Sequence, residues 1–429
     1  MLVSKYNFIC YNDYIMNIYI SGISGTGMGP LALMAKNAGF EVSGSDLARG
    51  AIYDELVAAG IKVAIGEQDG KFLRQKLVEG VDWFVYTSAL PENHPELKLA
   101  REAGIKITKR DDLTAFLVEE LGLSMVAVAG THGKTTTTAM IVWESLKLGL
   151  PVAYIVGTTL GFAPSGAYHP GDKFFVYEAD EYDRNFLKFH PWMSVITCIS
   201  YDHPDIYKTK RDYKSAFLQF KAQSEIVMEG DDDTIWEFSE DEISLAGRAR
   251  RRDARLAIGA TTLMLPFGSG LHKKDLIEII NEFPGVGRRF ERIAEGVYTD
   301  YAHHPEEIVA TIEVAKEEAE MTNKKGVVVV YQPHQNTRQH EVRDGYADAF
   351  VRADKVFWLP TYLTRENENL PIIKPKEFIE GLVNPEVAEV AELDNDLRTK
   401  LQEYLDKEYL VILMTAGPAD EWLRENFKG

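Results

Sequence analysis

Apolar and polar positions follow a pattern along the chain that predicts strands joined to helices. Near the N-terminus, the apolar positions of MNIYIS lead into a turn with three glycines, and the next residues predict a helix to about Asn37 and a strand that ends at Asp46. The same order returns in VAVAGTHGKTTTTAM (126–140) and in EGVYTDYAHHPEEIV (295–309). Helices and strands alternate between these openings, so the pattern predicts an α/β protein with parallel sheets.

Composition narrows the class of protein. The 429 residues, 45% of them hydrophobic, are enough for about three domains of ordinary size. A net charge of −19 repels a nucleic-acid backbone, and the apolar runs are too short to cross a membrane. The two cysteines, Cys10 and Cys198, have no spacing typical of a disulfide framework or a metal knuckle. We expect a soluble cytoplasmic protein that binds no nucleic acid and does not insert into a membrane.

The central opening predicts a phosphate-binding loop. Gly130 and Gly133 allow a tight turn between strand and helix, Lys134 adds a positive charge, and Thr135 offers a hydroxyl to a magnesium ion. The general pattern G-x-x-x-x-G-K-[ST] is incomplete, because Val128 stands at its first glycine. The preceding apolar strand nevertheless supplies the structural context that such a loop needs.

Two polar segments follow the next apolar runs. Glu178 comes after FFVY, and His203 comes after SVITCISYD. Because parallel strands end at one edge of a sheet, both residues are predicted at the edge where the phosphate loop lies. There, a carboxylate and a neutral imidazole can hold Mg²⁺ or Mn²⁺ beside a triphosphate. The acidic run EADE is also typical of an ordinary helix N-terminus, and that alternative stays open for Glu178.

Two further segments allow more than one interpretation. The first glycine-rich turn has Ser24 in place of the middle glycine of a dinucleotide fingerprint, and Asp46 stands where a ribose-binding acid is expected. That segment predicts either a nucleotide site or a plain α/β turn. In GVGRRFE, Arg288 and Arg289 follow hinge-like glycines and are either anion ligands or a solvated turn. The runs DDD (231–233) and RARRR (248–252) predict solvated surface.

Several motifs together resemble one enzyme family. GTHGKTTTT, EADEYD, DHPDIY, GVGRRFE, DYAHHP and QPHQNTR occur in the order found in Mur ligases, the ATP-dependent amide-forming enzymes of bacterial peptidoglycan synthesis. The resemblance covers the chain from about Met16. The segments GISGTGMGPLA, SGSD and YTSAL are most similar to the branch that joins L-alanine to UDP-N-acetylmuramate.

The resemblance implies the architecture and the chemistry. It implies a Rossmann-like UDP-sugar domain (1–122), a central P-loop ATP-binding domain (123–291) and a Rossmann-like amino-acid domain (292–429). ATP would phosphorylate the muramyl carboxylate with the help of Mg²⁺ or Mn²⁺, and L-alanine would attack the acyl phosphate. We expect a monomer or a homodimer.

The motifs and the resemblance assign residues to five roles. The predicted catalytic residues are Lys134, Glu178, His203, His334 and Arg338. The predicted ATP-binding residues are Gly130, Thr131, His132, Gly133, Lys134, Thr135, Thr136, Arg289 and Asp300. The predicted UDP-sugar residues are Gly22, Ser24, Gly25, Thr26, Gly27, Met28, Ser45, Asp46 and Ser88. The predicted residues for the amino acid and the muramyl group are His304, His334 and Arg338. The predicted metal ligands are Thr135, Glu178 and His203.

The chain also departs from the family. Related ligases carry a G-x-H-N-x-x-N-x-x-A-A segment at the adenine site, whereas LMLPFGSGLHKKDLIEIINEF lacks the asparagine pair and is shorter. We therefore expect weak adenine recognition. Cys198 replaces the usual Asn and Gln335 the usual Arg, and Phe217 stands where other branches carbamylate a lysine, which the alanine-adding branch lacks.

Two alternatives to an alanine-adding ligase stay open. One is a recycling ligase that attaches a preformed tripeptide to the same UDP sugar. The other is a non-catalytic nucleotide-binding or UDP-sugar-binding relative that has lost adenine recognition. The presence of Lys134, Thr135, Glu178 and His203 argues against the second.

Overall fold

The computed structural model describes residues 15–87, 90–203, 206–230, 240–266, 268–364, 366–367 and 369–427. Ser88, Cys10 and the acidic run at 231–233 lie outside these ranges, so the predictions made for them are untested. The chain forms two compact units, Met1–Trp236 with Leu256–Glu282, and Glu237–Arg255 with Phe283–Gly429.

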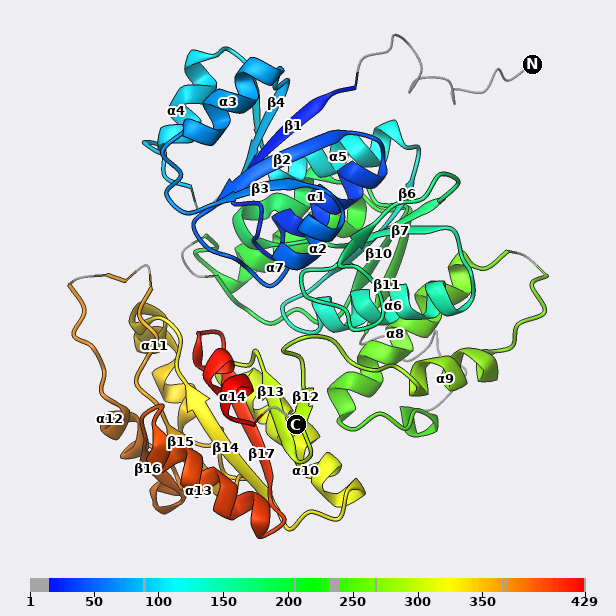
Figure 1. The fold of residues 1–429 in the computed structure, drawn as a ribbon. Helices are drawn as coiled ribbons and strands as arrows, with labels where there is room; N and C mark the ends of the chain where they lie inside the picture. Colours follow the sequence, from blue (N-terminus) through cyan, green and yellow to red (C-terminus); the bar gives the residue numbers. More distant parts are fainter. Residues whose placement is uncertain are drawn as a thin grey trace. The chain divides into compact units, whose positions relative to one another are not determined.

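The first unit begins with a five-stranded parallel sheet of order β3-β2-β1-β4-β5. Side chains alternate along β1, so Ile18 and Ile20 pack on the α1 and α5 face while Tyr19 packs on the α3 and α4 face. Helices therefore cover both faces (Figure 1). The elements are β1 (Asn17–Ser21), α1 (Met28–Asn37), β2 (Glu41–Asp46), α2 (Tyr53–Ala58), β3 (Lys62–Ile65), α3 (Lys71–Glu79), β4 (Trp83–Tyr86), α4 (Pro95–Glu102), β5 (Lys106–Lys109) and α5 (Arg110–Glu120).

A second sheet of the first unit has the order β11-β10-β6-β9-β7-β8, with only β8 antiparallel to its neighbour. Its inner strands are apolar on both faces, as expected for strands covered on both sides. The elements are β6 (Ser124–Ala129), α6 (Lys134–Lys147), β7 (Val152–Ile155), β8 (Gly166–Ala167), β9 (Phe174–Glu178), η1 (Tyr182–Lys188), β10 (Met193–Ile196), α7 (Lys210–Ala222), β11 (Ile226–Glu229) and α9 (Lys273–Asn281).

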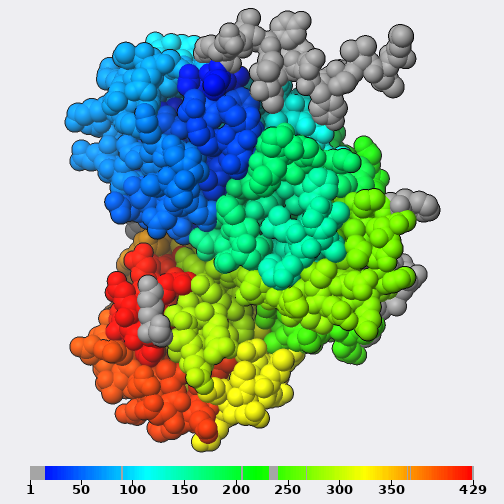
Figure 2. Space-filling model, turned by 45° about the vertical axis from the view of Figure 1, so that its right-hand side comes forward, coloured from blue at the N-terminus to red at the C-terminus, as the bar shows by residue number. Residues whose placement is uncertain are grey.

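The two sheets of the first unit share one hydrophobic core. Residues of α1 and α5 pack together with residues of β6 and β9 in that core. The backbone of Gly166 in β8 lies so close to Pro30 in α1 that an added Cβ would approach the Pro30 carbonyl oxygen to 2.1 Å. Figure 2 shows the blue and green surfaces of these two parts in contact on the face that it presents. The predicted UDP-sugar and ATP regions are thus built into one compact unit.

The second unit contains a six-stranded sheet of order β12-β13-β17-β14-β15-β16, with β12 antiparallel to β13. One face packs on α10 and on Tyr346 and Phe350, and the other packs on α13 and α14. The elements are η3 (Glu240–Glu242), β12 (Glu291–Ala294), β13 (Val297–Asp300), α10 (Pro305–Met321), β14 (Val327–Gln332), α11 (Asn336–Val342), η4 (Arg343–Tyr346), β15 (Lys355–Trp358), α12 (Pro375–Ile379), η5 (Pro385–Val387), β16 (Ala388–Val390), α13 (Asn395–Asp406), β17 (Leu410–Thr415) and α14 (Ala419–Phe427).

The run RARRR is not solvated surface throughout, so that prediction was wrong. It begins helix α8 (Arg248–Met264), whose residues up to Arg255 belong to the second unit. Arg248 is exposed, but Arg251 donates to Glu317 at 2.7 Å, and burial lowers the pKa of Arg250. Arginine side chains can be buried along their methylene stems while their charges are paired. Because the sequence does not reveal this burial, a run of arginines suggests solvated surface.

The α/β class with three parallel or mixed sheets is confirmed. The domain boundaries after residues 122 and 291 remain predictions. Within the described ranges, no helix is both long and apolar enough to cross a membrane.

Candidate functional site

The loop between β6 and α6 has the geometry of a phosphate site. Gly130 and Gly133 have φ angles of 142° and 84°, which side chains rarely adopt. A Cβ on Gly130 would lie 2.1 Å from the Thr197 hydroxyl oxygen. Helix α6 starts at Lys134 with no acidic residue in its first turn and no side-chain cap. Its first N–H groups and dipole therefore favour an anion.

The segment after β10 holds this loop in place. Thr131 donates its N–H to the Cys198 carbonyl (2.9 Å) and its hydroxyl to the Ser200 carbonyl (2.6 Å). The Thr197 hydroxyl donates to the His132 carbonyl, and the His132 N–H donates to the Cys198 sulfur at 3.4 Å. Cys198 thus supports the loop through its backbone and its side chain.

Lys134 is held inside the loop. Its Nζ donates to the carbonyls of Gly130 (2.5 Å) and Thr131 (3.3 Å) and lies 3.1 and 2.9 Å from the two carboxylate oxygens of Glu181. Burial lowers the pKa of the ammonium, but the carboxylates of Glu181, Asp180 and Glu178 outweigh it and keep that pKa above its ordinary value. Lys134 is therefore charged at neutral pH.

The predicted metal ligands lie in two places. The Thr135 hydroxyl donates to both oxygens of Glu178 (2.9 and 3.0 Å) at the end of β9. His203 has a φ of 58°, and its Nε2 lies 3.8 Å from Glu181 Oε1 and 3.7 Å from Asp202 Oδ2. The hydroxyl and carboxylate oxygens of Thr135 and Glu178 are the donors that Mg²⁺ prefers. His203 faces a different acid, so its role as a ligand remains a prediction.

Glu181 was not predicted as a site residue from the sequence. It is fully buried, and besides Lys134 it accepts the Tyr213 hydroxyl at 3.4 Å, while its carbonyl accepts the Tyr207 hydroxyl at 2.6 Å. A buried carboxylate needs a counter-charge, and the Lys134 ammonium supplies it for Glu181. Its place three residues after Glu178 was the available signal, but the acidic run could equally have been a solvated helix start.

Six of the nine predicted UDP-sugar residues line one cavity of about 440 Å³ in the first unit. These residues are Gly22, Gly25, Thr26, Gly27, Met28 and Asp46. Asp46 accepts the N–H groups of Ser24 and Leu47, both at 2.8 Å, which fixes the turn. Ser45 lies in a buried network, where it donates to Glu96 at 2.7 Å, and Gln68 links this network to the cavity wall.

Arg110 at the start of α5 also lines this cavity and was missed. Its Nε and Nη2 lie 3.1 Å from Asp111 Oδ1, and Nη2 lies 3.9 Å from Asp180. Its Nη1 lies 2.7 Å from the place that a Cβ on Gly27 would take. Arg110 therefore faces the glycine-rich turn from a helix that begins 83 residues later, a proximity that only the tertiary fold creates.

In the second unit, the buried carboxylate of Asp300 accepts hydrogen bonds from two backbone N–H groups. Its Oδ2 accepts the Phe290 N–H and its Oδ1 accepts the Ala302 N–H, both at 2.7 Å, and burial raises the pKa of its carboxyl despite the positive charge of Arg289. Oδ2 thus fastens the hinge segment to β13, and Oδ1 holds the turn that follows β13. The guanidinium of Arg289 lies 5.1 Å from the Tyr301 ring centre. The roles of Asp300 and Arg289 in ATP binding remain predictions.

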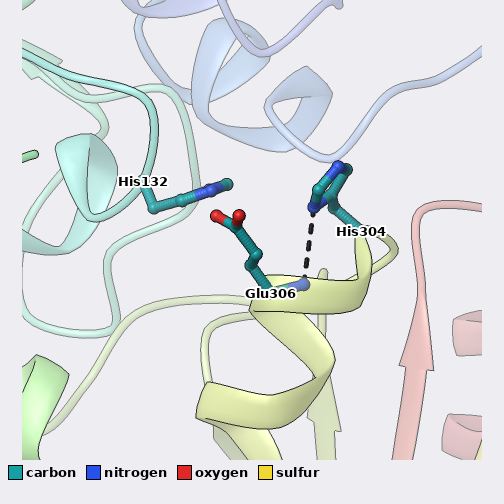
Figure 3. A group of neighbouring side chains, drawn as sticks. All are labelled: His132, His304 and Glu306. Atoms are coloured by element: carbon teal, nitrogen blue, oxygen red, sulfur yellow. Dashed lines mark hydrogen bonds between the residues drawn. The ribbon is translucent and has the colours of Figure 1, made fainter. Parts of the chain in front are cut away.

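Two of the three predicted amino-acid residues lie around a histidine that was not predicted. His303 contacts Arg338 through a hydrogen bond of 2.8 Å, and its ring lies 5.7 Å from that of His334. His304 is the N-cap of α10, where its Nδ1 accepts the Glu306 N–H at 3.4 Å (Figure 3). His334 and Arg338 are thus brought together around His303, whereas His304 turns to its own helix.

Three parts of the chain match domains of one family. Residues 17–120 match the Mur ligase family, catalytic domain, residues 128–248 match the Mur ligase middle domain, and residues 288–417 match the Mur ligase, glutamate ligase domain.

Similar proteins cover nearly the whole chain. A UDP-N-acetylmuramate–L-alanine ligase of Fusobacterium nucleatum is 30% identical over 93% of this chain and 94% of its own. The Lactiplantibacillus plantarum enzyme of the same name is 33% identical over 85% and 89%. In structure, a UDP-N-acetylmuramate-alanine ligase of Thermotoga maritima has a TM-score of 0.75 at 24% identity over 96% of this chain and 98% of that one. A murein peptide ligase of Psychrobacter arcticus has a TM-score of 0.62 at 21% identity, with the same coverage. The chain therefore belongs to the Mur ligase family.

Proposed function

We propose that the chain is an ATP-dependent ligase that joins L-alanine to the carboxylate of UDP-N-acetylmuramate. The observation that carries this proposal is that relatives 30%, 33% and 32% identical, matched over most of both chains, are all named UDP-N-acetylmuramate–L-alanine ligase. The phosphate loop, with Lys134, Thr135 and Glu178 in contact around it, supplies the machinery that such a reaction needs.

The reaction must first activate a carboxylate, which is a poor electrophile. Transfer of the γ-phosphoryl group of ATP to a carboxylate oxygen gives an acyl phosphate and ADP. The neutral amine of L-alanine then attacks the acyl carbon, and the tetrahedral intermediate expels inorganic phosphate and loses a proton to form the amide. Two anions meet in the first step, so positive charge and aligned N–H groups at the phosphate loop lower its barrier.

Residues of the first unit would serve the ATP side. The N–H groups of the first turn of α6 and the Lys134 ammonium would hold the phosphates. Thr135 and Glu178 would hold Mg²⁺, which, when bound, offsets charge on the phosphates. The cavity lined by Gly25, Gly27 and Arg110 would hold the UDP sugar, with Arg110 as a counter-charge for its diphosphate.

Residues of the second unit would serve the acceptor. Arg338 offers a guanidinium for the carboxylate of L-alanine, and His334 lies beside it around His303. We assign His304 to the same acceptor and muramyl region. We place the reaction in the cytoplasm, where ATP is available.

The test is phosphate release with ATP, Mg²⁺, UDP-N-acetylmuramate and L-alanine, with each omitted in turn. The proposal predicts release that requires all four, and a product mass equal to that of the amide. Lys134→Ala should lose the activity, whereas Lys147→Ala, in the exposed last turn of the same helix, should keep it. Absence of release in the complete mixture would favour a non-catalytic relative instead.

A further inference from the structure

His303 has a hydrogen-bonding arrangement that fixes its protonation state. Arg338 Nη1 lies 2.8 Å from His303 Nε2, and His303 Nδ1 lies 3.0 Å from the Tyr301 carbonyl oxygen. A guanidinium can only donate a hydrogen bond, and a carbonyl oxygen can only accept one. Nε2 must therefore accept and Nδ1 must donate. The imidazole is neutral, with its single proton on Nδ1.

The backbone of His303 is held by the same network that carries Arg338. The Tyr331 hydroxyl donates to the His303 carbonyl at 3.0 Å, and the hydroxyls of Tyr331 and Tyr346 lie 2.8 Å apart. The Tyr346 hydroxyl also lies 2.7 Å from Gln339 Oε1, and Gln339 donates to the His334 carbonyl at 2.9 Å. Gln339 follows Arg338 on α11, so the network links the His303 backbone to the helix that carries Arg338.

We propose that His303 is a positioning residue whose neutral imidazole fixes the direction of the Arg338 guanidinium for the carboxylate of the acceptor. This inference rests on the proposed function only for the role of Arg338. Protonation of Nε2 would place an N–H against the guanidinium, so the hydrogen bond would be lost and two positive charges would face each other. The orientation of the Arg338 guanidinium therefore depends on pH.

The charged and titratable groups around His303 set the direction of that dependence. They are Tyr301 on its own loop, Glu307 on α10, Tyr331 on β14, His334 after β14, Arg338 on α11, Tyr346 on η4 and Arg289 before β12. Burial lowers the pKa of His303, and the positive charges of Arg338 and Arg289 add to this.

Besides the hydrogen bond to the Tyr301 carbonyl, Glu307 opposes the effect of burial on this pKa. Its Oε2 lies 3.3 Å from His303 Nδ1, but it also accepts the N–H groups of His303 (3.0 Å) and His304 (3.1 Å). The net effect keeps the pKa of His303 below its ordinary value. His303 is therefore neutral at pH 7 and above, and the arrangement is lost only at a pH below the ordinary pKa of a histidine.

The first experiment compares the wild type with His303→Gln between pH 5 and 8. Glutamine offers Arg338 an amide oxygen but does not titrate. The ratio of the two kcat/KM values for L-alanine cancels the titration of the substrate. We expect a ratio of wild type to variant that is constant above pH 7 and decreases at the pH at which His303 becomes protonated. A ratio that stays constant across the pH at which the ¹⁵N shifts show the His303 imidazolium would overturn the inference.

Matched variants separate positioning from folding. His303→Ala should raise the KM for L-alanine at least about tenfold without raising the KM for ATP, and His303→Gln should restore most of this loss. His340→Gln changes a partly exposed histidine on α11 that contacts the Pro371 carbonyl, and it should leave both the KM and the pH profile unchanged. Equal losses for His303→Ala and His303→Gln, or a parallel rise in the KM for ATP, would contradict a positioning role.

A second readout needs no substrate. The ¹⁵N NMR shifts of the histidine rings distinguish the two neutral tautomers from the imidazolium, and the His303→Gln spectrum assigns the His303 signals. We expect the Nδ1–H tautomer at pH 7 and a displaced Nε2 signal in Arg338→Lys. An Nε2–H tautomer or an imidazolium at pH 7 would overturn the inference. If the Nδ1–H tautomer is found but L-alanine is not a substrate, only the proposed function fails.

Discussion

Removal of Lys134 should cause two separable defects. Lys134→Ala deletes the ammonium that would bind the phosphates. In the described part of the chain, this ammonium is also the only lysine or arginine charge within 4 Å of the Glu181 carboxylate. A phosphate clamp of this kind contributes about 3 kcal/mol or more to the transition state, which corresponds to a loss in kcat/KM of at least about 150-fold. ATP-dependent phosphate release should therefore become undetectable or nearly so.

The second defect concerns stability. Glu181 is fully buried, so Lys134→Ala leaves a carboxylate without its counter-charge. Breaking a buried ion pair by removing one partner costs about 3–5 kcal/mol. Adding Glu181→Gln to Lys134→Ala removes the unpaired charge, so the double variant should recover most of the lost free energy of unfolding while staying inactive.

The assay pairs activity with local stability. Phosphate release gives turnover, hydrogen exchange of the α6 amides gives the local free energy of unfolding, and calorimetry with UDP-N-acetylmuramate tests the sugar site, which Lys134 does not line. Lys147→Ala is the matched control on α6. Near-full turnover of Lys134→Ala would refute the phosphate-loop assignment. An unchanged α6 stability would refute the account of the Lys134–Glu181 pair.

Three further predictions test other parts of the site. Glu178→Gln and His203→Ala should each raise the Mg²⁺ concentration needed for half-maximal activity, and unchanged Mg²⁺ dependence in both would remove them from the metal site. GTP should replace ATP at a cost in kcat/KM of no more than about tenfold, about 1.4 kcal/mol, because the segment at 268–272 lacks the asparagine pair; a preference for ATP of about a thousandfold would mean that another segment reads the base. Glu144→Gln concerns a fully buried carboxyl that accepts a hydrogen bond from Thr261 at 2.9 Å, and burial raises the pKa of Glu144 well above its ordinary value. A raised folded-state pKa means that stability present below the unfolded pKa is lost as the pH rises toward the folded pKa, so the free energy of unfolding of the variant, measured by hydrogen exchange of α6, should increase relative to that of the wild type across that range; a constant difference would contradict this.

The parts of the site that could be predicted are those in which a few neighbouring residues determine the geometry. The strand, glycine turn and Lys-Thr start of α6 specify the phosphate loop locally, and the turn after β1 is equally local. Arg110 and Glu181 could not be assigned in this way. Arg110 reaches Gly27 only through sheet packing, and the acidic run after β9 does not reveal which of its carboxylates is buried.

The two histidines of DYAHHP make the same point. Their sequence neighbours do not distinguish them, and the prediction selected His304. In the structure the Tyr301 carbonyl and the Arg338 guanidinium orient the His303 ring, whereas the His304 ring caps its own helix. The packing of the loop after β13 against α11 decides which histidine reaches Arg338, and these two segments meet only after the sheet has formed.

The central claim is the identity of the acceptor, and a competition measures it most directly. The enzyme is supplied with ATP, Mg²⁺ and UDP-N-acetylmuramate together with equal concentrations of L-alanine and the preformed tripeptide, and the products are separated by mass. The account predicts that UDP-N-acetylmuramoyl-L-alanine is the dominant product and that its formation equals phosphate release. A dominant tripeptide product would contradict the account and identify a recycling ligase.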